Sequence, residues 1–481
     1  ALHRGSQSHV GSPSCSTIIS IKLIDLHSSM SWHVMARCMN MKQWVLYSLI
    51  TGFLIIGALL FSGCIEQQAS PSAETITIGV VASMSGPAST TGKDIWQSAE
   101  LAAEEINAQG GVFVKSLNKK IPITLVQGDD ESTREGGIKA VSKLITQDNV
   151  DLLVGGYSSA VVSAHQSIVA ENKVPYIISG GSSTSVSHRN DIDTSYMFFH
   201  RPNTDDSAKA SMLFINEVVR PEIYKKFSLP SDRPLRLALI FQDSPFGKGQ
   251  QVAVRNLTKD LDLPIEIVAE ETFKMGESDF RTALTSVKAK KPDIIYAVTF
   301  LNELIPLTQQ ARRDVGLNTL ILSIENNDDP DYYTGVGEYG DYTLMESRFS
   351  PYAIPKGSTA EPTKKFLEKF QTKYGGFAGM MGAATYESVY IAAKAIENAG
   401  TLDKGAVQKA LSELSMDHMI EVMKDGKIRF SPDFHESSFD LYVEQMKMDP
   451  AAGEIRPQIV WPSSISETAF VIPDWYQPGS P

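Results

Sequence analysis

Residues 150–184 read VDLLVGGYSSAVVSAHQSIVAENKVPYIISGGSST. A short apolar run at 150–154 leads into a turn rich in glycine and serine, a helical pattern at 160–172 and a second apolar run at 175–179. Continuously apolar strands that alternate with helices are typical of a parallel sheet with helices on both faces. The stretch therefore predicts a strand–helix–strand unit of an α/β fold.

The same alternation continues on both sides of this unit. We predict further strands at 75–83, 121–128, 235–242, 265–270, 293–299 and 319–323. We predict further helices at 94–109, 135–148, 205–219, 247–261, 279–288 and 303–314, with a polar excursion at 221–234. Because the rhythm restarts near residue 205, we expect a second doubly wound unit.

A third segment begins near residue 342 and holds too few strands for a third sheet. Its predicted strands are at 342–349, 427–430, 439–447 and 459–461, and its predicted helices are at 362–374, 383–400 and 405–414. We expect these pieces to complete the edges of the first two sheets. The predicted fold is α/β, with two doubly wound parallel-sheet lobes joined by several crossing hinge segments. The first lobe is predicted at 75–200 plus 350–415, and the second at 201–349 plus 416–481.

The composition is ordinary for a folded protein, and the charge is acidic. Of the 481 residues 42% are hydrophobic, and the net charge of −12 excludes the basic surface that nucleic-acid binding needs. The three cysteines all lie within the first 64 residues. The rest of the chain therefore has no disulfide, no cysteine–metal site and no cysteine nucleophile.

A secretory type of targeting signal begins at Met41. A lysine is followed by an apolar run at 44–61 and by small residues before Cys64. The ending LFSGC at 60–64 resembles the lipobox of prokaryotic lipoproteins, which implies a signal peptide at 41–63 and lipid on Cys64. An uncleaved membrane anchor is the alternative. Both alternatives place the remaining chain outside the cytoplasm.

The predicted signal peptide is flanked by two further segments, at 1–40 and 64–74. Because a targeting signal works at the start of a chain, we expect 1–40 to be an upstream extension that is not part of the protein. The polar stretch 64–74 contains proline and serine and is expected to be a flexible tether.

Motifs that carry catalysis are missing from the sequence. It contains no GxxxxGK[ST] phosphate loop, no HExxH zinc motif and no GxSxG nucleophile elbow. The acid pairs Asp129-Asp130 and Asp328-Asp329 are expected to be solvated turn formers. We therefore expect no catalytic residue, no metal and no cofactor, and a binding protein rather than an enzyme.

Small polar residues follow two predicted strands of the first lobe, where ligands bind in open α/β sheets. Gly155, Gly156, Ser158 and Ser159 come between the strand at 150–154 and a helix. The free N–H groups of that helix and the serine hydroxyls favour a carboxylate. The alternative is an ordinary helix cap at Ser158 or Ser159.

The next strand ends in the same way. It is followed by a run of donors that we expect to face the same point, namely Gly181, Ser182, Ser183 and Thr184. A flexible loop is the alternative reading. In the second lobe, Phe300 and Glu325 follow two further strands. An acid there pairs with an ammonium and an aromatic ring supplies a cation–π face, whereas a loop acid and a core phenylalanine are the alternatives.

Several motifs are shared with a known family over residues 75–465. They are IGVVASMSGP at 78–87, Gly92, AAEEINAQGGV at 102–112, VGGYSS at 154–159, QDSPFG at 242–247 and QARRDVGL at 310–317. By these motifs the chain resembles the type I periplasmic solute-binding proteins, specifically the leucine/isoleucine/valine-binding-protein family of ABC importers. The resemblance implies a Venus-flytrap architecture, in which two lobes close around a ligand.

The resemblance also implies roles for the residues at the strand ends. The donors that would hold an α-carboxylate are Ser158 or Ser159 together with Gly181, Ser182, Ser183 and Thr184. Phe300 and Glu325 would meet an α-ammonium. The family often has tyrosine where Phe300 stands, so that hydroxyl is lost here. Thr90 and Phe246 match positions that line the family's side-chain pocket.

We therefore expect an extracytoplasmic substrate-binding lipoprotein of an ABC importer. It would be a monomer that captures a small zwitterion, with a branched-chain or other amino acid as the leading ligand, and delivers it to a membrane permease. A ligand-sensing receptor subunit is one alternative. A binder of an amide, urea or a small carboxylate is another.

Overall fold

The computed structural model describes residues 75–479, apart from the side chain of Glu325. The predicted extension at 1–40, the signal peptide at 41–63, Cys64 and the tether at 64–74 lie outside these residues. Those four interpretations therefore stay predictions.

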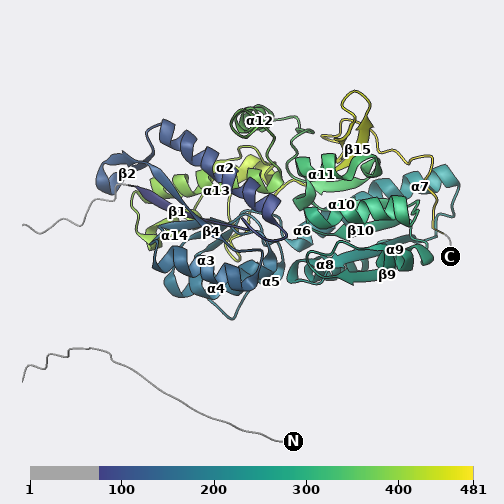
Figure 1. Cartoon of the computed structure of the whole chain (residues 1–481), viewed down its shortest axis with the longest axis horizontal. Coiled ribbons are helices and arrows are strands. Elements are labelled where there is room, and N and C mark those ends of the chain that lie inside the picture. Colours follow the sequence, from purple (N-terminus) through teal and green to yellow (C-terminus); the bar gives the residue numbers. More distant parts are fainter. Residues whose placement is uncertain (1–74, 480–481) are drawn as a thin grey trace, which may run out of the picture. The chain divides into compact units, whose positions relative to one another are not determined.

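The first sheet has five parallel strands (Figure 1). Their order is β4 (Ile123–Asp129), β1 (Ile76–Ala82), β5 (Leu152–Gly155), β6 (Tyr176–Ile178) and β7 (Met197–Phe199). One face packs on α2 (Ser89–Ala108) and α13 (Met380–Ala399), and the other on α3 (Arg134–Thr146) and α4 (Ser159–Asn172). Every residue of β5 and β6 is buried, which is why these strands are continuously apolar.

The second sheet has seven strands. Their order is β16 (Glu454–Trp461), β15 (Tyr442–Asp449), β12 (Leu344–Ser347), β11 (Leu320–Ser323), β10 (Ile294–Val298), β8 (Leu235–Gln242) and β9 (Ile265–Phe273). The last five in this order are parallel, whereas β15 and β16 form an antiparallel edge. The predicted pair of doubly wound lobes is confirmed, with this mixed edge as an addition.

Helices cover both faces of the second sheet as well. One core contains residues of α6 (Thr204–Phe214), α7 (Arg220–Phe227) and α8 (Pro245–Asp260). The other contains residues of α9 (Arg281–Ala289), α10 (Leu301–Gln309) and α11 (Pro330–Val336). The helix α7 corrects our prediction of a polar excursion from residue 221, because the side chains of Ile223 and Tyr224 are buried against this core.

The remaining elements are short or lie outside the two sheets. The other helices are α5 (Thr184–Ser187), α12 (Ala360–Tyr374) and α14 (Lys404–Ser412). Single turns of 3₁₀ or π-helix are η2 (Lys115–Leu117), η3 (Ile215–Val219), η4 (Gln310–Asp314), η5 (Glu325–Asn327), η6 (Gly337–Gly340) and η7 (Lys424–Gly426). Two small hairpins pair β2 (Val112–Val114) with β3 (Lys119–Ile121) and β13 (Met416–Asp417) with β14 (Lys427–Ile428).

One expectation for the third segment is wrong, and for one predicted lobe boundary we propose another position. The strand predicted at 427–430 is β14, which pairs with β13 and extends neither large sheet. Glu436 bridges Phe199 at the end of β7, and the rings of Phe430 and His435 contact that of Phe198, so this part of the chain lies beside the first sheet. We therefore propose that the chain returns to the second lobe near β15 and not at residue 416. The other lobe boundaries stay predictions.

The acid pairs are also more buried than predicted. Asp130 and Asp328 have no exposed surface, and Asp329 is only 8% exposed. Asp130 accepts a hydrogen bond from the Ser83 hydroxyl (2.6 Å), and Asp328 accepts one from the Ser347 hydroxyl (2.7 Å). Asp130 and Asp328 therefore link neighbouring strand ends, and Asp329 caps α11 by accepting from the Asp331 N–H, so these three are not solvated turn formers. Asp129 is half-buried and accepts from the Glu131 N–H, which agrees with the predicted turn.

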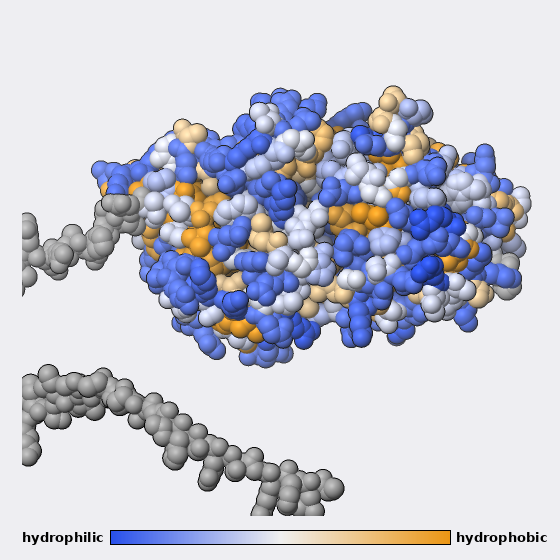
Figure 2. All heavy atoms as spheres, viewed as in Figure 1, coloured by the Kyte–Doolittle hydropathy of each residue, from blue (hydrophilic) through white to orange (hydrophobic). Residues whose placement is uncertain are grey.

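The surface seen in Figure 2 is mostly hydrophilic, with hydrophobic residues in scattered patches. Within the described residues, no helix combines the length and the apolar character that crossing a membrane requires.

Candidate functional site

The two sheets share a strand order that prepares one ligand site. The parallel strands of each sheet lie side by side in the order β4-β1-β5-β6-β7 and β9-β8-β10-β11-β12. In both sheets the strand that comes first in the sequence therefore lies between the second and the third. Ligands bind outside the carboxyl ends of such strands, where the order reverses. The residues that follow β5, β6, β8, β10 and β11 are therefore candidates for binding a ligand.

The turn after β5 depends on two glycines. Gly155 and Gly156 have φ angles of 96° and 79°, which L side chains rarely adopt. A Cβ at Gly156 would lie 2.2 Å from the Tyr176 hydroxyl oxygen. The turn thus carries Tyr157 and Ser158 to the start of α4, whose first residue is Ser159.

The loop after β6 is tied directly to this turn. The Gly181 N–H donates to the Tyr157 carbonyl (2.7 Å), and the Ser183 N–H donates to Ser159 Oγ (3.2 Å). A Cβ at Gly180 would lie 2.5 Å from the Gly156 carbonyl oxygen. The glycines therefore permit the two loops to approach each other, and Ser159 and Gly181 come together as predicted.

Aromatic residues of the second lobe face these loops. The Phe300 ring centroid lies 4.6 Å from that of Tyr157 with an interplanar angle of 35°, and 5.8 Å from that of Phe246 with an angle of 21°. Asn326 in η5 donates to the Tyr157 hydroxyl (3.2 Å) and to the Thr299 carbonyl (3.0 Å). The strand ends of the two lobes thus meet at one place.

A small cavity lies at this meeting point. Its volume is about 20 Å³, which is room for about one water molecule. Both lobes line it, through Tyr157, Ser159, Gly180, Gly181, Ser182, Phe246, Phe300, Asn326 and Met381. The cleft is therefore closed in this structure, and a larger ligand enters only when the lobes or the aromatic side chains move apart.

Half of the predicted binding residues line this cavity. They are Ser159, Gly181, Ser182, Phe246 and Phe300.

The other predicted binding residues lie elsewhere. Ser158 is the N-cap of α4, and the Ser183 hydroxyl caps α5 by accepting from the Ser185 N–H. Thr184 is half-buried in α5, and Thr90 is exposed on α2. The side chain of Glu325 lies outside the described residues. Ligand contacts by all the predicted residues stay predictions.

Four cavity residues were missing from the sequence prediction. Tyr157 lies inside the GGYSS turn, and Gly180 and Asn326 are sequence neighbours of predicted residues. Their places directly after predicted strands could therefore have identified them from the sequence. Met381 comes from α13, which is remote in sequence from every motif at the cleft. No local pattern identified it.

The cavity is lined by uncharged groups among the described side chains. Burial raises the pKa of the Tyr157 phenol well above its ordinary value despite the hydrogen bond from Asn326, so the hydroxyl stays neutral. Glu303 lies beneath the aromatic wall, where its Oε2 accepts from the Phe300 N–H (2.9 Å). Burial raises its pKa to about 7, against the lowering effect of backbone N–H groups. The described lining therefore offers a ligand hydroxyls, an amide and aromatic faces.

One group among the described residues has the spacing of a metal site. Candidate ligand atoms of His200, Glu387 and Glu421 lie within 4.8 Å of one another. Arg348 Nε also lies 3.1 Å from Glu421 Oε1, so two cations face two carboxylates if His200 is protonated. The group is complete as an ion-pair network and gives no argument for a metal.

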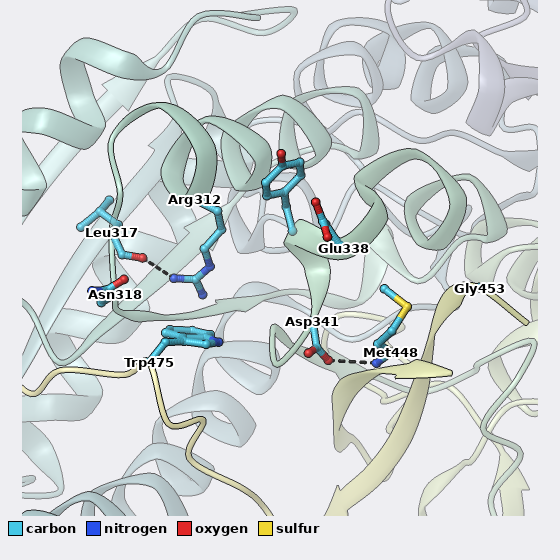
Figure 3. Close-up of a pocket in the computed structure, with 9 residues that line it drawn as sticks. Arg312, Leu317, Asn318, Glu338, Asp341, Met448, Gly453 and Trp475 are labelled. Carbon is cyan, nitrogen blue, oxygen red and sulfur yellow. Dashed lines mark hydrogen bonds between the residues drawn. The ribbon is translucent and has the colours of Figure 1, made fainter. Parts of the chain in front are cut away.

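A larger hollow of about 760 Å³ lies on the second lobe alone (Figure 3). The Arg312 guanidinium lies 4.2 Å above the Trp475 ring and donates to the Leu317 carbonyl. Asp341 accepts from the Met448 N–H (2.9 Å). Because no residue of the first lobe lines this hollow, closure of the two lobes would not enclose a ligand there.

Comparisons with known proteins support the fold described above. The family described as "Periplasmic binding protein" matches residues 75–454. An amino acid binding protein of Pseudomonas aeruginosa is 26% identical over 332 residues, which is 68% of this chain and 80% of that protein.

Solved structures show the same fold. The branched-chain amino acid substrate-binding protein LivJ of Streptococcus pneumoniae, in complex with isoleucine, has a TM-score of 0.66 at 24% identity and covers 81% of this chain and 100% of its own. A solute-binding protein of R. palustris, in complex with benzoate, has a TM-score of 0.65 at 16% identity and covers 82% of this chain and 99% of its own.

Proposed function

We propose a transport function for this chain, which belongs to the periplasmic binding protein family. We infer that it is the extracytoplasmic substrate-binding component of an ABC importer. It would capture a small molecule between its lobes and deliver it to a membrane permease. Proteins of this family bind solutes and are not enzymes, and the amino acid binding relative from Pseudomonas supports an amino acid as the leading ligand.

The observation that carries this proposal is the cavity lined jointly by both lobes. Closing around a ligand removes it from water, which strengthens its polar contacts with the protein. The ligand in turn stabilises the closed form by its preference for that form. Ser159 and Ser182 offer hydroxyls to a carboxylate on one side, and the second lobe offers an apolar aromatic wall on the other.

The ligand class is tested by a thermal-shift screen, followed by isothermal titration calorimetry. The purified protein is mixed with the common L-amino acids, with amides and urea, and with small carboxylates that include benzoate. We expect saturable binding of at least one amino acid and an upward shift of the unfolding temperature. If amino acids fail and a carboxylate without an ammonium binds, the second candidate holds, and the benzoate complex of the R. palustris neighbour favours that candidate. If nothing binds, the proposal is wrong.

We further propose that lipid on Cys64 anchors the protein. The support is the LFSGC sequence at 60–64 after an apolar run. The variant Cys64→Ser should move from the membrane pellet to the soluble fraction, whereas the tether variant Ser70→Ala should remain in the pellet. Retention of Cys64→Ser in the pellet would indicate an uncleaved helix instead.

A further inference from the structure

The first turns of two helices from different lobes lie next to each other. The helix α13, which packs on the first sheet, has Gly379 as its N-cap, and α11, which packs on the second sheet, has Asp329. The Met380 N–H donates to the Asp328 carbonyl (2.9 Å), which joins the start of α13 to the segment that leads into α11. Met381 lines the cavity between the lobes, so this contact lies beside the cleft.

An aspartate accepts hydrogen bonds from the first turn of each helix. Asp94 of α2, in the first lobe, accepts from the N–H groups of Gly379 (3.3 Å) and Gly382 (2.6 Å). Asp329, in the second lobe, caps α11 by accepting from the Asp331 N–H (2.8 Å). Hydrogen bonds from N–H groups favour the ionised form of a carboxyl group. We therefore expect both acids to be ionised when the lobes are apart and water reaches them.

In the closed structure these two carboxyl groups, which we call the interlobe pair, lie against the same glycine. The Gly379 N–H binds Asp94 Oδ1, and a Cβ on Gly379 would lie only 2.6 Å from Asp329 Oδ2. Each acid is 8% exposed. Two like charges that are buried close together repel each other and have lost the water that would stabilise them. Closure therefore requires either a positive charge at this contact or the loss of one negative charge.

The surroundings of the interlobe pair supply no positive charge from the described residues. The charged side chains that act on the pair are Asp331 in α11 and Asp328 in the preceding segment, and both are acids. The phenols of Tyr157 and Tyr352 lie close enough to be affected by the charge of Asp329. A phenol carries no positive charge, so the pair can lose its repulsion only by binding a proton.

The titration of the two carboxyl groups agrees with this geometry. Burial raises the pKa of Asp94 well above its ordinary value, and the charge of Asp329 raises it further. Burial also raises the pKa of Asp329, from 3.8 to about 7, against the lowering effect of the Asp331 N–H. A group with a raised pKa in the closed form is protonated there at pH values at which it is ionised in the open form.

We infer that closure of the lobes takes up one proton from the solvent, that Asp94 and Asp329 share it across the contact, and that opening releases it. This inference rests on the lobe closure of the proposed function and adds a regulation of the same cleft. Because the closed form binds the additional proton, a lower pH favours closure and a higher pH favours opening. The change is expected between the ordinary carboxyl pKa of 3.8 and the closed-state value of about 7.

Small-angle X-ray scattering of the purified protein without added ligand tests the inference. The radius of gyration should be smaller at pH 5 than at pH 8. Asp329→Asn should be as compact at pH 8 as the unmodified protein is at pH 5, because asparagine caps a helix as well as aspartate does and its amide can donate to Asp94. Asp94→Asn should have the same effect from the other lobe. Asp403→Asn, which changes the exposed cap of α14, is the matched control and should behave as the unmodified protein does.

Calorimetry with L-leucine as the probe provides a second measurement. In the unmodified protein the affinity should fall by up to about tenfold per pH unit between pH 5 and pH 7, because binding then takes up about one proton. In Asp329→Asn the decline should be much shallower. Leucine stays a zwitterion over this range, so the change reports the protein and not the probe.

The outcomes separate this inference from the proposed function. If the radii of gyration of Asp329→Asn and the unmodified protein are equal at both pH values, the inference is wrong and the transport proposal stands. If Asp329→Asn does not fold by circular dichroism, the same comparison with Asp94→Asn decides. If leucine and all other compounds of the ligand screen fail to bind, the proposed function is wrong, and the scattering still decides whether closure takes up a proton.

Discussion

The His200 imidazole Nε2 lies 2.9 Å from Glu387 Oε2, and neither side chain has exposed surface. His200 follows β7 of the first sheet, and Glu387 belongs to α13. Glu421 Oε2 approaches the same nitrogen at 3.1 Å, and Arg348, which follows β12 of the second sheet, contacts the other oxygen of Glu421. Segments that leave both sheets therefore meet in one buried ion-pair network.

This network predicts that stability falls as the pH rises. Burial alone lowers the pKa of His200, but the hydrogen bonds and charges of Glu387 and Glu421 outweigh it, so the pKa is raised above 6.5. A raised pKa in the folded state contributes stability that is complete below pH 6.5 and is lost as the pH passes the folded-state value. The unfolding temperature between pH 6 and pH 9 should therefore decline.

The variant His200→Gln provides the comparison. Removing one partner from a buried ion pair costs about 3–5 kcal/mol, so its unfolding temperature at pH 6 should be lower. Its decline between pH 6 and pH 9 should also be shallower, because the titrating imidazole is gone. An equal decline in both proteins would show that other groups cause the pH dependence.

Ser159→Ala should weaken ligand binding. Ser159 lines the cavity, and loss of a charge-assisted hydrogen bond to a carboxylate costs about 1–2 kcal/mol, or roughly 5- to 30-fold in affinity. Titration calorimetry with the tightest acid of the ligand panel measures the effect. Ser163→Ala, farther along α4, is the matched control and should bind as the unmodified protein does. Unchanged affinity of Ser159→Ala would remove this serine from the site and point to Ser158.

Glu325→Ala should weaken an amino acid ligand by at least about 2 kcal/mol, because it leaves the ammonium group without a countercharge. A carboxylate ligand without an ammonium should bind with unchanged affinity. Calorimetry with both ligand types measures this difference, and Glu338→Ala, an exposed acid in η6, serves as the control. Equal affinities of Glu325→Ala and the unmodified protein for the amino acid would refute the assignment.

Gly92→Ala should destabilise the fold although it lies in a helix. An added Cβ would lie 1.9 Å from the Ser83 carbonyl oxygen, so α2 would be pushed away from the end of β1. Such overpacking costs about 1–3 kcal/mol, which exceeds the gain of up to about 1 kcal/mol that alanine brings to a helix. Thermal unfolding measures the change. Gly376→Ala, where a Cβ meets no atom within 4 Å, should be neutral, and equal stability of the two variants would contradict the crowding argument.

Local sequence patterns were sufficient for the fold class and for part of the site. The apolar runs that form β5 and β10 are buried over their full lengths. Burial on both faces requires an uninterrupted run of apolar residues, which is recognisable in the sequence. Ser159, Gly181 and Phe300 were predicted because ligand residues follow such strands directly, and all three line the cavity between the lobes. The hairpin of β13 and β14 was misplaced because two-residue strands have no periodicity to detect.

What the sequence by itself determined is thus the succession of buried strands and helices, and with it the strand ends at which we expect a ligand to bind. Only the tertiary structure decided which of those ends meet. Tyr157 and Asn326 are 169 positions apart and share a hydrogen bond across the cleft, and Met381 reaches the same cavity from α13. The physical reason is that periodicity records how each element is buried on its own, whereas contacts across the cleft depend on how the two sheets are placed relative to each other.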